Sequence, residues 1–235
     1  MENIISNVRA ALIGQSDEKT KTGSQHFFKE TITCHGVKTK AVQQISKEMF
    51  SRVRTKTKQE IFALCDRLWE SGYLEESFIA CNWAYALRKQ FEPSDFPTFE
   101  RWIFNHVNNW ASCDTLCNHT VGDFIVMYPE YLNNLKDFAR SENRWMRRAS
   151  AVSLIVPAKK GKFLKEVMEI ADILLLDEDD MVQKGYGWML KVASQAHQKE
   201  IFSYVVRNKA AMPRTALRYA IEKMPAEMKK AAMVK

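Results

Sequence analysis

The sequence has few of the residues that end short strands: only 8 glycines and 6 prolines occur among 235 residues. This scarcity argues against a sandwich or barrel, which needs frequent turns between many short strands. No apolar run approaches the roughly 18–20 residues needed to span a bilayer. The first residues, Met1, Glu2 and Asn3, lack the basic stretch and apolar core of a secretory signal. We therefore expect a cytoplasmic protein with no membrane partner.

The five cysteines are odd in number and contain no CxxC pair, so a disulfide framework is not expected. Cys113, Cys117 and His119 are closely spaced, but no second cluster completes the three or four ligands that zinc normally takes. We interpret the two thiols as small buried side chains on a helix and expect no metal site. The P-loop, GxGxxG, HExxH and GxSxG motifs are also missing. We therefore expect no cofactor.

Positive charge is in excess, with a formal net charge of +7. The excess is concentrated in two stretches. One contains Lys38, Lys40, Lys47, Arg52, Arg54, Lys56 and Lys58, and the other Arg144, Arg147, Arg148, Lys159, Lys160, Lys162 and Lys165. Such surfaces supply the salt-sensitive part of nucleic-acid affinity. A solvated, mildly basic surface without a partner explains the charge equally well.

Apolar residues recur with helical spacing along most of the chain, and no segment has a convincing strand pattern. Helices are predicted at about Asn3–Ile13, Thr57–Trp69, Leu74–Phe91, Pro97–Asn108, Cys113–Met127, Glu130–Phe138, Trp145–Val156, Gly161–Leu175, Asp180–Ala193, Gln198–Asn208 and Pro213–Lys223. Short polar or Pro/Gly breaks separate them. The predicted fold class is all-α.

Weak internal repetition favours a particular all-α architecture. Segments beginning at Trp145, Met181 and Met212 share a small residue four places later, and Phe78–Leu87 resembles them more loosely. Their spacing is near the roughly 30–45 residues of helical repeats, and small residues let stacked helices approach closely. We predict an α-solenoid forming a single domain over residues 1–235. Its elongated concave face would suit a rod-like duplex.

Four residues are candidates for chemistry. Trp110 and Asp114 are four residues apart, so they share one face of a predicted helix. Arg148 lies in the second basic stretch, and Trp188 follows two glycines, Gly185 and Gly187, that would leave its ring accessible. Each has a structural alternative: core packing for the indoles, a helix-start carboxylate for Asp114, and a surface ion pair for Arg148.

These residues lie in segments with a familiar order and spacing. WASCD at Trp110–Asp114, TVGDF at Thr120–Phe124, RWMRRA at Arg144–Ala149 and QKGYGW at Gln183–Trp188 resemble the AlkD family of bacterial DNA alkylation-repair glycosylases. The resemblance extends from His35 to the C-terminal helices. It implies HEAT-like helical repeats around a concave, basic DNA-binding face. It also implies a cleft with two tryptophans, an aspartate and an arginine, which match Trp110, Trp188, Asp114 and Arg148.

The resemblance implies excision of cationic alkylated purines, such as 3-methyladenine and 7-methylguanine, in base excision repair without deep base flipping. Asp114, Trp110 and Trp188 would be catalytic, with the carboxylate stabilising an oxocarbenium-like transition state. The residues expected to contact DNA are Arg148, Arg147, Lys38, Thr39 and Lys191. The expected partner is double-stranded DNA containing alkylated bases, bound by a monomer. A catalytically silent DNA-binding solenoid or a protein-binding scaffold remains the alternative.

Overall fold

The computed structural model describes residues 2–234, and these form an all-α fold, which confirms the predicted class. Among the described residues the only β pairing is one isolated bridge, between Thr33 and Tyr73. The chain packs into two compact units, Met1–Thr115 and Leu116–Lys235. That residues 1–235 act as one repeat domain therefore stays a prediction. Every described helix is too short or too polar to cross a membrane.

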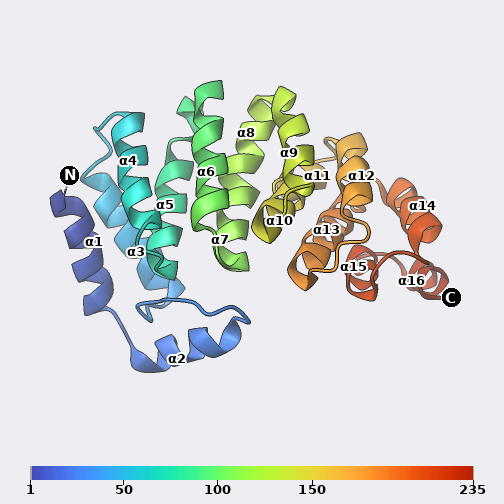
Figure 1. Cartoon of the computed structure of the whole chain (residues 1–235), viewed down its shortest axis with the longest axis horizontal. Coiled ribbons are helices and arrows are strands. Elements are labelled where there is room, and N and C mark those ends of the chain that lie inside the picture. The colour runs from blue at the N-terminus through green and yellow to red at the C-terminus, as the bar shows by residue number, and fades with distance from the viewer. Residues whose placement is uncertain (1, 235) are drawn as a thin grey trace. The chain divides into compact units, whose positions relative to one another are not determined.

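In the first unit most helices pack against the helix that lies two positions away in the chain. Its helices are α1 (Glu2–Gly14), α2 (Glu18–Phe27), α3 (Thr39–Ser51), α4 (Lys58–Trp69), α5 (Leu74–Ala86), α6 (Phe96–His106) and α7 (Trp110–Thr115). One row of contacts runs from α1 through α3 and α5 to α7, while α4 packs on α5 and α6. Figure 1 shows α2 set apart below α1 and α3. This two-row pattern is that of stacked helix pairs.

Local sequence explains where these helices start and what they bury. Thr57 caps α4 in a reciprocal capping box with Glu60, which satisfies two backbone N–H groups at the helix start. Fully buried Phe99 and Trp102 of α6 pack against Phe62 of α4, and Trp83 of α5 packs against Phe50 of α3. Large aromatic rings bury the most apolar area per residue, so they dominate the stability of this core.

The second unit repeats the two-row pattern. It begins with the π-helical segment Leu116–Val121 and continues with α8 (Gly122–Met127), α9 (Leu132–Ala139), α10 (Arg144–Val152), α11 (Ile155–Lys159), α12 (Leu164–Ile173), α13 (Asp180–Ala193), α14 (Gln198–Asn208), α15 (Arg214–Ala220) and α16 (Ala226–Met233). One row runs from α10 through α13 to α15, and in the other α9 packs on α12 and α14 on α16 (Figure 1).

The recurring small residues lie where the helices of the second unit meet. Ala149, Gly185 and Ala216 are all buried, on α10, α13 and α15. A Cβ added at Gly185 would lie 3.3 Å from Cγ of Arg148 on α10. A Cβ at Gly187 would lie 2.7 Å from Cβ of Tyr219 on α15. Gly185 therefore permits close helix packing, as the repeated small residues predicted. Gly187 has the same role, although the sequence suggested that the two glycines leave the Trp188 ring accessible.

Most predicted helices are present, but one ends early and three others were not predicted. The helix predicted over Leu74–Phe91 ends at Ala86, and a 3₁₀ turn follows at Arg88–Gln90. No helix was predicted for α2, α3 or α16. The reason is plainest for α2, which buries none of its residues and so has no apolar stripe.

We expect Gly187→Ala to destabilise the protein, because the added methyl group meets both the Tyr219 side chain and the Ala216 carbonyl oxygen, 2.9 Å away. The loss should be about 1–3 kcal/mol of unfolding free energy, measured by urea titration.

The matched control is Gly23→Ala on α2, where a Cβ meets nothing within 4 Å. This change should be neutral or should stabilise the protein by roughly 0.5–1 kcal/mol, since alanine favours helix. Equal effects of the two substitutions would contradict the packing role of Gly187.

Candidate functional site

The first unit carries Trp110 and Asp114 on the short helix α7. Asn109 precedes this helix and is 2% exposed; its Oδ1 accepts a hydrogen bond from the backbone N–H of Ser112 at 2.9 Å. The Ser112 hydroxyl lies 2.8 Å from that of Ser77 on α5. These buried polar contacts fix the start of α7 against α5. Trp110 and Asp114, one turn apart, are both half-buried on the helix held in this way.

Two phenylalanines surround the indole of Trp110. The Phe28 ring stacks on it, with centroids 5.4 Å apart and planes inclined by 25°. The Phe27 ring meets the indole edge-on at 5.8 Å and is 70% exposed. Phe28 also packs against the buried cluster of Ile32, Cys34 and Leu74. This pair was not predicted from the sequence, although two adjacent phenylalanines at the end of a polar segment were a visible signal.

The predicted DNA contacts Lys38 and Thr39 lie at the start of α3, and both are exposed. The loop before them is fixed by one buried carboxylate. Glu75 accepts hydrogen bonds from the backbone N–H groups of residues 35, 36 and 37, at 2.9, 2.8 and 3.0 Å. Gly36 has φ +82°, and a Cβ there would lie 2.7 Å from the Asp17 carbonyl oxygen, so only glycine fits this turn.

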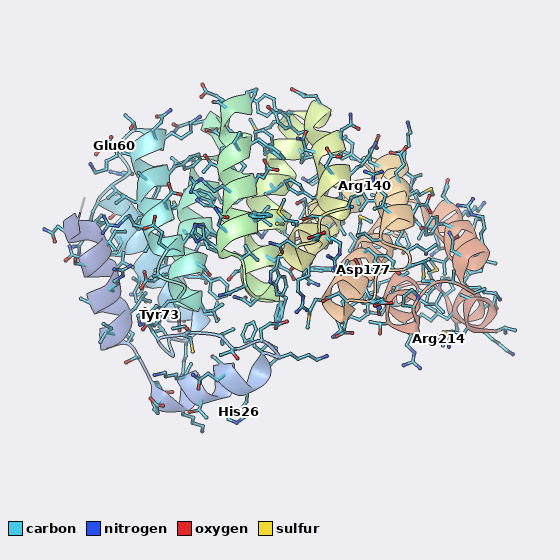
Figure 2. All side chains as sticks on the ribbon, in the orientation of Figure 1. His26, Glu60, Tyr73, Arg140, Asp177 and Arg214 are labelled. Carbon is cyan, nitrogen blue, oxygen red and sulfur yellow. The ribbon has the colours of Figure 1, made fainter. Side chains whose placement is uncertain are left out.

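A second buried carboxylate lies beside the first. Glu76 is 1% exposed; it pairs with Arg9 at 3.1 Å and with Nε2 of His35 at 3.2 Å. The His35 ring in turn stacks on Tyr73, with centroids 4.0 Å apart; Tyr73 is labelled in Figure 2. Burial alone would raise the pKa of Glu76, but the hydrogen bonds from His35 and Arg9 outweigh it and leave the pKa below its ordinary value.

The second unit carries the other two candidates, Arg148 on α10 and Trp188 on α13. Arg148 is only 5% exposed, and its Nη1 donates a hydrogen bond to the Met181 carbonyl oxygen at the start of α13. Its alkyl chain packs against Gly185, where a side chain would meet it. Trp188 is half-buried. The four candidates are therefore divided between the units, two in each.

The remaining predicted DNA contacts of the second unit have acidic partners. The Arg147 guanidinium pairs with Asp177 at 2.6 Å and donates to the carbonyl oxygens of Ser141 and Glu142. Asp177 lies just before α13 and is labelled in Figure 2. Lys191 pairs with Glu222 at 3.0 Å. These two cations are partly neutralised within the protein, whereas Lys38 presents its charge to solvent.

Cys113 and Cys117 are both fully buried, as the sequence suggested, and His119 is exposed. A thiol in the core and an imidazole at the surface do not face a common point. Within residues 2–234, no group of three or more His, Cys, Asp or Glu side chains is arranged to hold a metal ion.

A protein-family model and a solved structure are similar to this chain. The model of the family described as DNA alkylation repair enzyme matches residues 8–224. Among solved structures, the fold is similar to that of a predicted DNA alkylation repair enzyme from Enterococcus faecalis. The TM-score is 0.80 at 16% identity, covering 90% of this chain and 98% of that one. No curated protein matches the sequence.

The buried Glu76 should make stability depend on pH. Its folded-state pKa is lowered, so the carboxylate stabilises the fold above its ordinary pKa near 4.5 and loses that effect as pH falls further. Glu76→Gln should cost about 1–3 kcal/mol of unfolding free energy at pH 7, because it weakens hydrogen bonds to Arg9 and His35. The difference from the parent protein should shrink below pH 4.5. Urea titrations at pH 7 and pH 3.5 would measure it; a difference independent of pH would contradict the assignment.

Proposed function

Because the chain belongs to the DNA alkylation repair enzyme family, we propose that it is a DNA glycosylase that releases cationic alkylated purines from double-stranded DNA. The proposed substrates are 3-methyladenine and 7-methylguanine. One observation supports this best: a half-buried carboxylate, Asp114, lies one turn after a half-buried indole, Trp110, on a helix whose start is fixed by buried hydrogen bonds. A scaffold protein would have no need of this combination.

The proposed reaction requires few catalytic groups from the protein. An N3- or N7-alkylated purine is already positively charged, so its departure needs no general acid. As the glycosidic bond breaks, its electron pair goes to the purine, and positive charge develops on the sugar. Water then adds to the sugar carbon and loses a proton. The Asp114 carboxylate would stabilise the developing charge and place the water, which is the kind of electrostatic effect that usually contributes most.

The indoles would contribute less than the carboxylate. An aromatic face contacts a cation with roughly 0.5–2 kcal/mol, which is about one decade in rate. Phe28 covers one side of the Trp110 ring, so the ring is held in place for such a contact. Trp188 on α13 would act in the same way. Arg148, fixed to the start of α13 through Met181, is proposed as a DNA-binding residue.

The two competing functions are a catalytically silent DNA-binding protein and a protein-binding scaffold. Stacked helices serve all three functions, so the fold does not separate them. The proposed enzyme would contact the cationic base from the surface of its helices, without a deep pocket. Base-flipping enzymes instead take the base into a pocket. The carboxylate is the residue whose removal separates an enzyme from the alternatives.

Asp114→Asn should reduce the rate of 7-methylguanine release from methylated duplex by one to several decades, on the order of 2–4 kcal/mol, because it removes the charge and nearly keeps the shape. The rate is measured under single-turnover conditions in EDTA, since no metal is proposed. Duplex affinity and melting temperature should change little.

The matched control is Asp123→Asn, another half-buried carboxylate, on α8. It should leave the rate of base release unchanged. Full activity in a folded Asp114→Asn protein would refute the proposed mechanism, and an inactive parent protein would favour the silent alternatives.

DNA affinity should fall steeply with salt and vary little with sequence, because phosphate contacts release counterions. Lys38→Ala should lower the slope of log affinity against log salt by about one. Lys191→Ala should lower it less, since Glu222 already neutralises part of that charge. Fluorescence anisotropy with an undamaged duplex measures both. An affinity equal at low and physiological salt would argue against DNA binding.

A further inference from the structure

Glu75 is an acid in an unusual position. It lies in the first turn of α5, where a carboxylate normally faces solvent, yet it is 3% exposed. Among the described residues, its hydrogen bonds all come from three consecutive backbone N–H groups, those of His35, Gly36 and Val37. Hydrogen bonds to an ionised acceptor are about twice as strong as neutral ones. The carboxylate is therefore the main polar support of this loop.

The loop has a few other restraints. Its β pairing is the single bridge between Thr33 and Tyr73, with one hydrogen bond from the Leu74 backbone N–H to the Thr33 carbonyl oxygen, at 2.9 Å. The Gly36 carbonyl oxygen also accepts from the Asp17 backbone N–H at 3.0 Å, and the His35 ring stacks on Tyr73. At Gly36 it turns through a positive φ that other residues rarely adopt. Without the carboxylate, three backbone N–H groups would lose their acceptor, two of them in buried positions. The loop conformation thus depends largely on Glu75.

The residues next in the chain are Lys38 and Thr39, which the proposed function uses as DNA contacts. Lys38 has an extended backbone, and its side chain makes no capping hydrogen bond to α3. Its orientation is therefore set by the backbone on either side: residues 35–37, which Glu75 holds, and the first turn of α3, where the N–H groups of Ala41 and Val42 donate to the Lys38 carbonyl oxygen. A chain of contacts leads from the buried carboxylate, through residues 35–37, to two exposed side chains.

We propose that Glu75 is a positioning residue for DNA binding: it fixes the backbone of residues 35–37 so that Lys38 and Thr39 face the phosphate backbone. This inference rests on the proposed function, because it takes DNA as the ligand. It does not depend on catalysis, since Glu75 would not touch the base or the sugar. The role predicts a change in binding that a purely structural role would not produce.

The informative substitution is Glu75→Gln. One oxygen of the carboxylate accepts from Gly36 and Val37 and the other from His35. An amide can replace only one of these oxygens, so its NH₂ group would face an N–H donor and the loop would shift. The matched control is Glu76→Gln, the same change at the neighbouring buried acid, which bonds the side chains of Arg9 and His35 but not the loop backbone.

The measurement is the dissociation constant for an undamaged duplex by fluorescence anisotropy, at several salt concentrations, with the folded fraction checked by circular dichroism. Glu75→Gln should weaken binding about tenfold and lower the salt slope by about one, as expected for one lost phosphate contact. Base release at saturating DNA should stay within about twofold of the parent rate. Glu76→Gln should lower stability but keep the parent affinity.

A double-mutant cycle with Lys38→Ala completes the test. If Glu75 acts through Lys38, the two losses of affinity are less than additive. Should Glu75→Gln fail to fold, Glu75→Asp, which is too short to reach all three N–H groups, takes its place. Parent affinity and salt slope in a folded Glu75 variant, or fully additive losses, would overturn the inference. A parent protein that binds duplex but releases no base would refute the glycosylase and leave the positioning role standing.

Discussion

Most helices of this protein are stable mainly because neighbouring helices cover their apolar stripes. Isolated helices of eight to fourteen residues are marginal in water, so packing supplies what their length does not. In the second unit this packing requires helices to approach closely, and Gly185 and Gly187 remove the side chains that would keep them apart. Trp188 is on the same turn of helix. The position of this indole therefore depends on a contact made by its two neighbours.

The sequence predicted best those elements whose residues repeat every three to four positions. The long helices α4 and α13 have clear apolar stripes, and they lie where that pattern indicated. Periodicity could not indicate α2, since it has no stripe to detect. The candidate site residues came from the resemblance to a known family. The single-domain prediction stays open, because the chain divides into two compact units between Thr115 and Leu116.

The surroundings of the site could not have been predicted, because they depend on contacts between distant residues. Phe28 and Trp110 stack although 82 positions separate them in the chain (110 − 28). In the sequence, Glu75 and Glu76 have the position of surface acids at a helix start. Their burial depends on a loop that lies 40 residues earlier in the chain and bonds to them. Arg147 and Arg148 look alike in a basic stretch, yet one pairs with an aspartate and the other is buried against a backbone carbonyl. Because ion pairs such as Arg147–Asp177 neutralise part of the charge, the number of basic residues overstates the positive charge available to a polyanion.

Helix α2 is the least anchored part of the first unit. None of its residues is buried, and it is held by the Asp17 cap at one end, the Gly36 turn beside it and the phenylalanine pair at the other end. An element with so little buried area opens at a small fraction of the free energy of global unfolding. Its backbone amides should therefore exchange with solvent deuterium long before those of α4 or α5. Because Phe27 ends this helix, its edge-on contact with Trp110 is attached to the element that detaches most easily, while the stacked Phe28 ring is held by the buried cluster and the indole by α7.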